Sequence, residues 1–161
     1  MIGNDIVDLA LSQIESNWKR KGFIDKIFTV QEQSAINSSE NQEIMIWNLW
    51  SRKEAAYKIY NRQTGIRNYN PIQFECSDLD LEIGKVVFDN KVFFTKTEIT
   101  SDYIYTESVV KIIDFDKIKT IARPENIQKE EGIPYYFDVL DLVNKPLSIT
   151  HHGRFERIIS I

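Results

Sequence analysis

The chain has little of the chemistry that supports disulfides or soft metals, with one cysteine and two histidines among 161 residues. Cys76 alone cannot close an intrachain disulfide, which excludes a disulfide-stapled secreted scaffold. His151 and His152 with a single cysteine cannot assemble a His/Cys zinc site, so any bound metal would be a hard cation held by carboxylates. The longest apolar run, residues 44–50, is broken by Asn48 and is far shorter than the roughly 20 residues of a membrane span. The sequence therefore argues against zinc chemistry, a Cys–His nucleophile and a membrane protein.

What is present is an ordinary globular composition, with 42% hydrophobic and 27% charged residues. This apolar content excludes disorder as the main state, and the length indicates a single domain. The formal net charge of −4 gives no global attraction to nucleic acid. Because the first residues lack the basic and apolar regions of a signal peptide, we expect a cytoplasmic protein.

The N-terminal third is expected to contain one strand and several helices. Residues 1–9 form a short apolar run and predict a buried strand. Residues 9–21 predict a helix with a basic last turn, ended by Gly22. Residues 29–32 form a capping box that begins a further helix, and residues 39–42 form a second one.

The strongest helical pattern in the chain runs over residues 40–62. It has a broad apolar surface, contains no proline or glycine, and is followed by Gly65 as a stop. The sequence therefore predicts a long central helix.

The second half of the chain is rich in β-branched and aromatic residues and predicts strands. The expected strands are residues 85–88, 91–96, 103–107, 109–113, 146–151 and 155–161. Asp89-Asn90 and Ser101-Asp102 separate neighbours as hairpin turns do. Residues 114–132 are polar and predict an irregular segment. The expectation is one α+β domain, an antiparallel sheet packed against the central helix, with an extra β-meander.

Asp5 is the first candidate for chemistry. A carboxylate inside an apolar strand must lie near the edge of the sheet, accept hydrogen bonds, or bind a cation, since an unpaired buried charge is costly. The simpler alternative is a solvent-facing or turn-capping aspartate beside Gly3. The same alternative applies to Asp8, which would face the other side of the strand.

Glu54 and Lys58 form the second candidate. Their spacing of four residues is typical of a surface ion pair on a helix. However, Glu54 shares a helix face with Trp47 and Trp50, and a charged pair beside large aromatics on a core helix indicates a site. The adjacent residues 55–56 are both alanine, which allows another element to approach closely.

Residues 147–154 are the third candidate. Strand alternation sends Ser148, Thr150 and His152 to one side and Ile149 and His151 to the other. Two histidines, a glycine and an arginine at a strand end could bind an anion. The alternative is a turn in which one histidine is satisfied by the fold.

The order of three blocks is more specific than any one of them: Gly3-x-Asp5, then residues 50–58 (Trp-Ser-Arg-Lys-Glu-Ala-Ala-Tyr-Lys), then residues 148–151 (Ser-Ile-Thr-His). With them the sequence resembles the 4′-phosphopantetheinyl transferase superfamily, particularly its short holo-acyl-carrier-protein synthase type. The resemblance covers residues 1–9, 28–65 and 146–161. It leaves about 71–135 as an enlarged β-rich insertion within a single domain, 1–161.

The resemblance implies a Mg²⁺-dependent transfer of 4′-phosphopantetheine from coenzyme A to a serine of an acyl or peptidyl carrier protein, with release of 3′,5′-ADP. By the same resemblance Asp5 and Glu54 are the metal ligands, and Lys58 reaches the transferring phosphate. The general base is Glu54 or a metal-bound water, and the sequence leaves both open. A catalytically degenerate member that binds carrier or coenzyme A without transfer is the alternative function.

The remaining implied contacts concern coenzyme and partner. Lys53, Lys58, Gly65 and His151 match positions that contact coenzyme A in relatives. The basic segment, defined as Lys19, Arg20 and Lys21, matches the region on which relatives dock acidic carriers, although dipole compensation at a helix end would also explain it. One copy of each motif implies a homo-oligomer with shared active sites, and a trimer is one form.

Overall fold

A computed structural model describes residues 1–161 as four α-helices, two 3₁₀-helices and ten strands. Their bounds in chain order are β1 (Ile2–Asp8), α1 (Leu9–Glu15), α2 (Phe23–Ile27), α3 (Val30–Ser38), α4 (Gln42–Thr64), η1 (Pro71–Gln73), β2 (Glu75–Ser77), β3 (Ile83–Phe88), β4 (Lys91–Ile99), β5 (Tyr103–Val109), η2 (Ile112–Lys117), β6 (Lys119–Thr120), β7 (Ile127–Glu130), β8 (Ile133–Asp138), β9 (Val143–His152) and β10 (Phe155–Ser160). No helix among them is long and apolar enough to cross a membrane.

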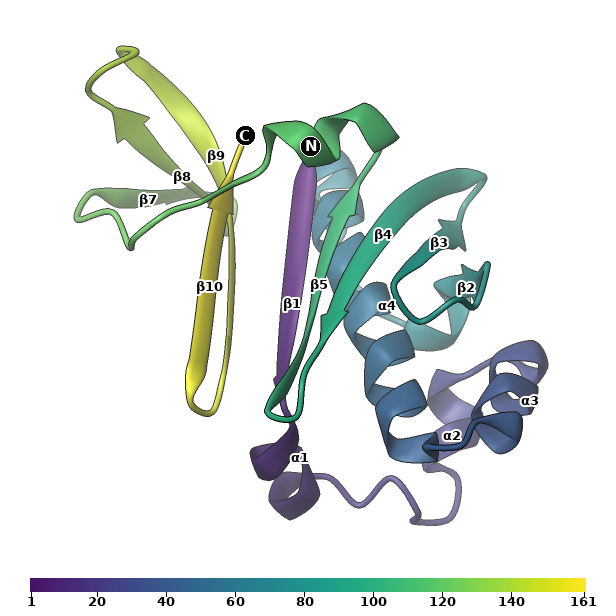
Figure 1. Ribbon diagram of the computed structural model, residues 1–161. Helices are drawn as coiled ribbons and strands as arrows, with labels where there is room; N and C mark the ends of the chain where they lie inside the picture. Colours follow the sequence, from purple (N-terminus) through teal and green to yellow (C-terminus); the bar gives the residue numbers. More distant parts are fainter.

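The first sheet is antiparallel, with the order β1-β5-β4-β3-β2, and α4 lies across one face of it (Figure 1). The main core lies between α4 and this sheet, where Ile59, Val86 and Ile104 are fully buried. Asp89 and Asn90 connect β3 to β4 with φ angles of 52° and 57°, as a tight hairpin turn requires. The predicted α+β class, central helix and antiparallel sheet are confirmed.

The second sheet has the order β6-β10-β9-β8-β7 and stands beside the first at an angle (Figure 1). Its strand β9 runs along β1, and the two strands do not form a backbone ladder. We call this boundary the seam. Side chains of β9 accept hydrogen bonds from every second N–H of β1: Ser148 from Asn4 (3.1 Å), Thr150 from Ile6 (3.1 Å) and His152 from Asp8 (2.8 Å). The predicted alternation along β9 is confirmed by these contacts.

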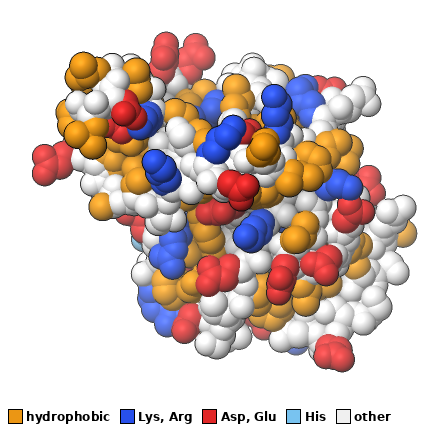
Figure 2. Space-filling model, turned by 45° about the horizontal axis from the view of Figure 1, so that its top comes forward, with side chains coloured by type: hydrophobic (Ala, Val, Ile, Leu, Met, Phe, Trp, Pro, Cys, Tyr) orange, Lys and Arg blue, Asp and Glu red, His pale blue; other side chains and the backbone are white.

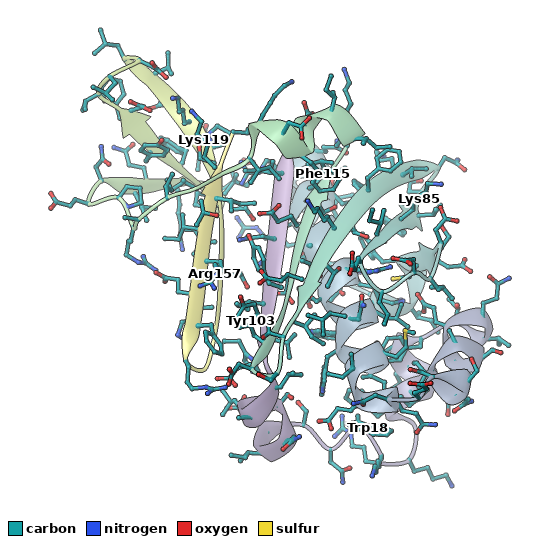
Figure 3. All side chains as sticks on the ribbon, in the orientation of Figure 1. Trp18, Lys85, Tyr103, Phe115, Lys119 and Arg157 are labelled. Atoms are coloured by element: carbon teal, nitrogen blue, oxygen red, sulfur yellow. The ribbon has the colours of Figure 1, made fainter.

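Charged side chains reinforce the seam toward the end of β1 at Asp8. Arg154 donates from Nη2 to Asp8 Oδ1 at 2.9 Å and from Nη1 to Asp102 Oδ1 at 3.2 Å. Arg157 of β10 lies over the Tyr103 ring of β5, 5.3 Å from its centroid, and both side chains are labelled in Figure 3. Because side chains supply these contacts, the two sheets are held together without a shared ladder.

Two predicted helix boundaries are wrong. The helix expected over residues 9–21 ends at Glu15, because Ser16 adopts an extended conformation, and Gly22 (φ 80°) precedes α2 instead of ending α1. The capping box expected over residues 39–42 is absent, because Asn41 is the N-cap of α4 and its side chain accepts from Ile44 N–H at 3.1 Å. The capping box of Thr29 and Glu32 and the stop at Gly65 are confirmed.

The strand predictions differ from the structure mainly in the polar part. The strand expected over residues 109–113 does not form, since β5 ends at Val109 and η2 begins at Ile112. Residues 114–132, expected to be irregular, contain β6 and β7, and neither β2 nor β8 was anticipated. The paired strands β3 to β5 form a meander that joins the same sheet as β1.

Candidate active site

A cavity of about 320 Å³ opens at the seam, between β1, α4 and the end of β9. Asp5 and Glu54 both line it, together with the aromatic rings of Trp47 and Trp50 and with His151. We call it the carboxylate cavity. The two acids, 49 positions apart in the sequence, are thus brought to one place by β1 lying against α4.

A close approach of α4 to β1 places the two acids. A Cβ atom at Gly3 would lie 2.0 Å from the carbonyl oxygen of Ala55, a distance that no side chain tolerates. Ala55 and Ala56 are themselves fully buried. Glycine on the strand and alanine on the helix therefore permit the packing that sets Asp5 opposite Glu54, as the alanine pair predicted.

Asp5 is held through one of its two carboxylate oxygens. Thr150 Oγ1 donates to Oδ1 at 3.2 Å, and Lys58 Nζ lies 3.9 Å from the same oxygen. Burial raises the pKa of Asp5 above its ordinary value, and the charge of Lys58 and the hydrogen bonds from Ser51 and Thr150 oppose that rise. The alternative of a freely solvated Asp5 is thereby excluded.

Glu54 accepts no hydrogen bond from the protein, and burial together with the charge of Asp5 raises its pKa to about 7, with Lys58 opposing. Two carboxylates with raised pKa values in one cavity form a donor set for a divalent cation. Nowhere does the chain gather three or more His, Cys, Asp or Glu side chains around one point. The pair therefore fits Mg²⁺, which takes one or two carboxylates and completes its shell with water and ligand phosphates.

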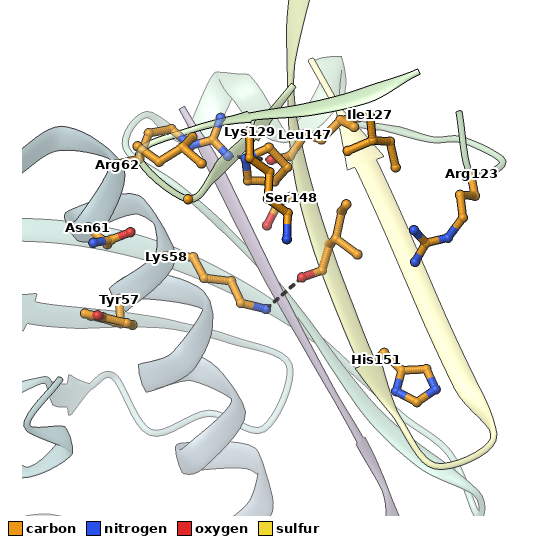
Figure 4. A pocket seen from close by; sticks show the side chains of 14 residues that line it. Tyr57, Lys58, Asn61, Arg62, Arg123, Ile127, Lys129, Leu147, Ser148 and His151 are labelled. Carbon is orange, nitrogen blue, oxygen red and sulfur yellow. Dashed lines mark hydrogen bonds between the residues drawn. The ribbon is translucent and has the colours of Figure 1, made fainter. Parts of the chain in front are cut away.

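A second cavity, of about 410 Å³, lies on the other side of Lys58, between α4 and strands β7 to β9 (Figure 4). Every charged side chain in its wall is basic: Lys58, Arg62, Arg123 and Lys129, with His151 beside them. We call it the cation-lined cavity. In a chain of net charge −4 such a wall favours a ligand with several negative charges.

Lys58 and His151 connect the two cavities. Lys58 Nζ donates to Asn4 O of β1 at 2.6 Å and to Ile149 O of β9 at 3.2 Å, the second bond being drawn in Figure 4. His151 lines both cavities and is exposed. The two carboxylates and the basic side chains therefore lie on either side of Lys58.

Arg62, Arg123 and Lys129 were missed by the sequence analysis. Arg62 lies one helical turn after Lys58 and donates from Nη2 to Leu147 O, so the helical spacing alone would have revealed it. Arg123 and Lys129 lie in the polar segment near β7, and only the pairing of β7 with β8 and β9 brings them to the cavity. No local pattern marks them.

Two residues expected to contact coenzyme A lie elsewhere. Lys53 is fully buried in the core, where Nζ lies 2.7 Å from Glu32 Oε2 and donates to Pro71 O at 3.0 Å, so it lines neither cavity. This corrects the prediction, because Lys53 directly precedes Glu54 and neighbouring residues of an α-helix point in directions about 100° apart. Gly65 caps α4 in a left-handed conformation (φ 72°) and also lines neither cavity.

The basic segment is exposed and lies in turns between α1 and α2. Arg20 lies over the ring of Phe23, 5.7 Å from its centroid, and Phe23 lines the carboxylate cavity. Because α1 ends at Glu15, the basic segment does not lie at the C-terminal end of a helix, and compensation of a helix dipole does not explain its charge. Figure 2 shows charges of both signs interspersed over the face that it draws.

Comparisons with known proteins agree with the site. A family model described as the 4′-phosphopantetheinyl transferase superfamily matches residues 1–113, which include Asp5, Glu54 and Lys58. The chain belongs to this superfamily. It is a 4′-phosphopantetheinyl transferase, the enzyme class that the sequence blocks predicted.

Individual relatives give the same family and fold. The chain is 32% identical over 91 residues to the holo-[acyl-carrier-protein] synthase of Fusobacterium nucleatum, which covers 56% of this chain and 71% of that protein. It also resembles the solved structure of the Helicobacter pylori holo-[acyl-carrier-protein] synthase in complex with coenzyme A (TM-score 0.55, 17% identity, 69% of this chain and 100% of that one). An apo-ACPS structure from Chronobacterium ammoiniagenes is similar (TM-score 0.54, 14% identity, 67% and 93%). At identities of 14% and 17%, the similarity to these solved structures establishes the fold alone.

Proposed function

We propose that this transferase moves 4′-phosphopantetheine from coenzyme A to a serine of an acyl or peptidyl carrier protein, that it requires Mg²⁺, and that it releases 3′,5′-ADP. The observation that carries the proposal is that the carboxylate cavity and the cation-lined cavity share His151 in their walls, with Lys58 of the second cavity 3.9 Å from Asp5 of the first. Coenzyme A has the matching layout, with a phosphate-rich nucleotide half and a reacting pyrophosphate.

Asp5 and Glu54 would hold Mg²⁺, which when bound neutralises charge on the pyrophosphate. Lys58 presents an ammonium at the junction of the cavities, where it meets the transferring phosphate. Arg62, Arg123 and Lys129 hold the remaining phosphates of the nucleotide half. These groups act by positioning and by electrostatic stabilisation, the main contributions to phosphoryl transfer.

The reaction forms one bond and breaks one. The serine oxygen of the carrier attacks the pantetheine-bearing phosphorus, and the bond from that phosphorus to the oxygen of 3′,5′-ADP breaks. The serine proton passes to Glu54 or to a water held in the carboxylate cavity, the two alternatives that the sequence left open. The leaving phosphate stays among the basic side chains of the cation-lined cavity.

The basic segment supports the choice of an acidic partner. Arg20 lies over the ring of Phe23 in the wall of the carboxylate cavity, and Lys19 and Lys21 flank it in the chain. The aromatic wall of this cavity would receive the approaching serine loop. An overall acidic enzyme needs a local positive surface to attract an acidic carrier, because complementarity acts through patches.

Transfer of labelled coenzyme A to a panel of apo acyl and peptidyl carriers, with Mg²⁺ and with EDTA, tests the proposal. We expect labelled carrier in the presence of Mg²⁺ only, and about a 10²-fold or larger loss for Glu54→Gln. If coenzyme A binds to the wild-type protein and no carrier is labelled, the catalytically degenerate alternative is correct.

Three expectations accompany this proposal. The cytoplasm remains the expected location, and about 71–135 remains the expected enlarged segment of a single domain. Self-association, with a trimer as one form, is supported by exposed apolar side chains around the β8–β9 turn: Phe137, Val139, Leu140, Leu142 and Val143. Sedimentation over a range of protein concentrations measures it.

A further inference from the structure

Thr150, a residue that is 95% buried, places its hydroxyl in the seam between the two strands that carry the site. It accepts a hydrogen bond from Ile6 N–H at 3.1 Å and donates to Asp5 Oδ1 at 3.2 Å. A hydroxyl has one proton, and the Ile6 N–H already occupies a lone pair. The proton of Thr150 is therefore directed at the Asp5 carboxylate.

The neighbouring seam residue Ser148 makes the same backbone contact without touching a carboxylate. It accepts from Asn4 N–H at 3.1 Å and donates to the side-chain oxygen of Asn4 at 2.7 Å. Ser148 and Thr150 thus close the seam in the same way, and only Thr150 also contacts an acid of the carboxylate cavity.

Two polar contacts of the Asp5 carboxylate fall on the same oxygen. Thr150 Oγ1 donates to Oδ1 at 3.2 Å, and Lys58 Nζ lies 3.9 Å from that atom. Fixing one oxygen of a carboxylate limits rotation of the group and leaves its other oxygen available to a ligand.

We propose that Thr150 is a positioning residue for cation binding, because it fixes Oδ1 of Asp5 so that Oδ2 is presented to the carboxylate cavity. This inference rests on the proposed function, in which Asp5 is a Mg²⁺ ligand, and extends it to a residue outside the matched family segment of residues 1–113. Hydrogen bonds that orient a metal-ligating carboxylate are typically worth 10- to 100-fold in metal affinity.

Three variants separate positioning from simple closure of the seam. Thr150→Val keeps the shape and loses the hydroxyl, whereas Thr150→Ser keeps the hydroxyl. Ser148→Ala is the control for closure of the seam, since it removes the same kind of seam acceptor two residues away. Because Ser148 also lines the cation-lined cavity, the coenzyme A affinity of this variant is measured first, so that each protein is saturated. Thr150→Ala, a smaller change with the same expected effect, serves if valine prevents folding.

Calorimetric titration of Mg²⁺ into each protein saturated with coenzyme A measures the effect, with thermal unfolding of the metal-free proteins in parallel. We expect Thr150→Val to raise the Kd for Mg²⁺ about tenfold or more, and Thr150→Ser to stay within about threefold of wild type. Ser148→Ala and Thr150→Val should lower the unfolding midpoint similarly, while Ser148→Ala leaves the Mg²⁺ affinity unchanged.

Two results would overturn the inference. One is an unchanged Kd for Mg²⁺ in Thr150→Val. The other is an equal loss of Mg²⁺ affinity in Ser148→Ala, which would show that Thr150 acts only by closing the seam. Wild-type protein that binds coenzyme A but no Mg²⁺ would instead refute the cation in the proposed function. The failure of the inference and the failure of the function are therefore distinguishable.

Discussion

Replacing Glu54 with glutamine should stabilise the metal-free protein at neutral and alkaline pH. Burial and the charge of Asp5 raise the pKa of Glu54 from 4.5 to about 7 in the folded chain. The folded state therefore holds a proton that the unfolded state releases, and ionising Glu54 in place becomes a cost. At about 1.36 kcal/mol per pKa unit, the difference between 4.5 and about 7 corresponds to about 3 kcal/mol.

The sign of the effect follows from the raised pKa. Below about pH 4.5 both states are protonated and Glu54 has no effect. Between pH 4.5 and about 7 the wild-type stability falls, and above that range the full cost is present. Glutamine cannot ionise, so the advantage of Glu54→Gln should grow over this window and reach about 2 to 3 kcal/mol at pH 8.

Urea unfolding at pH 4.5, 6 and 8 in EDTA measures this difference. The matched control is Glu125→Gln, an exposed glutamate that makes no hydrogen bond or ion pair with the protein and lies outside the carboxylate cavity, and it should show no such trend. Saturating Mg²⁺ at pH 8 should reduce the advantage of Glu54→Gln, because a cation favours the ionised form. A constant difference across pH would refute the idea that desolvation and Asp5 set the state of Glu54.

Two further predictions concern basic residues. Lys53→Met should destabilise the fold by about 3 to 5 kcal/mol in urea unfolding, because it leaves Glu32 buried without its ion pair; reduced coenzyme A affinity with unchanged stability would restore Lys53 to the site. Lys129→Ala should raise the Kd for coenzyme A in calorimetry by about threefold to tenfold, through loss of a cation from the phosphate cavity. Lys85→Ala, which removes a cation from β3 far from this cavity (Figure 3), should leave that Kd unchanged, and equal effects of the two variants would contradict the placement of the phosphates.

The parts of the fold that sequence reasoning found are those encoded locally. The central helix carries its own N-terminal and C-terminal signals and a continuous apolar face, so α4 differs from the expectation by about two residues at each end. Asp89 and Asn90 tolerate the left-handed conformation that their turn needs, which fixed the β3–β4 hairpin. The acids at positions 5 and 54 stood out because each interrupts an apolar pattern.

The parts that it missed depend on contacts between distant segments. Residues 16–21 have a helical composition, yet the chain leaves the helix at Ser16, and the rings of Trp18 and Phe23 pack against the core with α2 and α4. Lys53 lies on the same helix as Glu54, but its partner Glu32 lies on α3. The spacing of residues along the sequence does not reveal this pairing. Arg123 reaches the cation-lined cavity only because the second sheet is seated against α4.

Lys58 shows why the seam and the site cannot be separated in this molecule. Its ammonium donates to a carbonyl of β1 and a carbonyl of β9, and it is also the cation nearest to Asp5. The ammonium of Lys58 thus bridges the two strands and also offsets the negative charge of two acids. It offsets that charge only in part, since the pKa values of Asp5 and Glu54 remain raised. The uncompensated negative charge is what a divalent cation would neutralise. A change at Lys58 therefore removes hydrogen bonds of the seam together with the charge, whereas a change at Glu54, whose side chain makes no hydrogen bond to the protein, leaves the seam contacts in place.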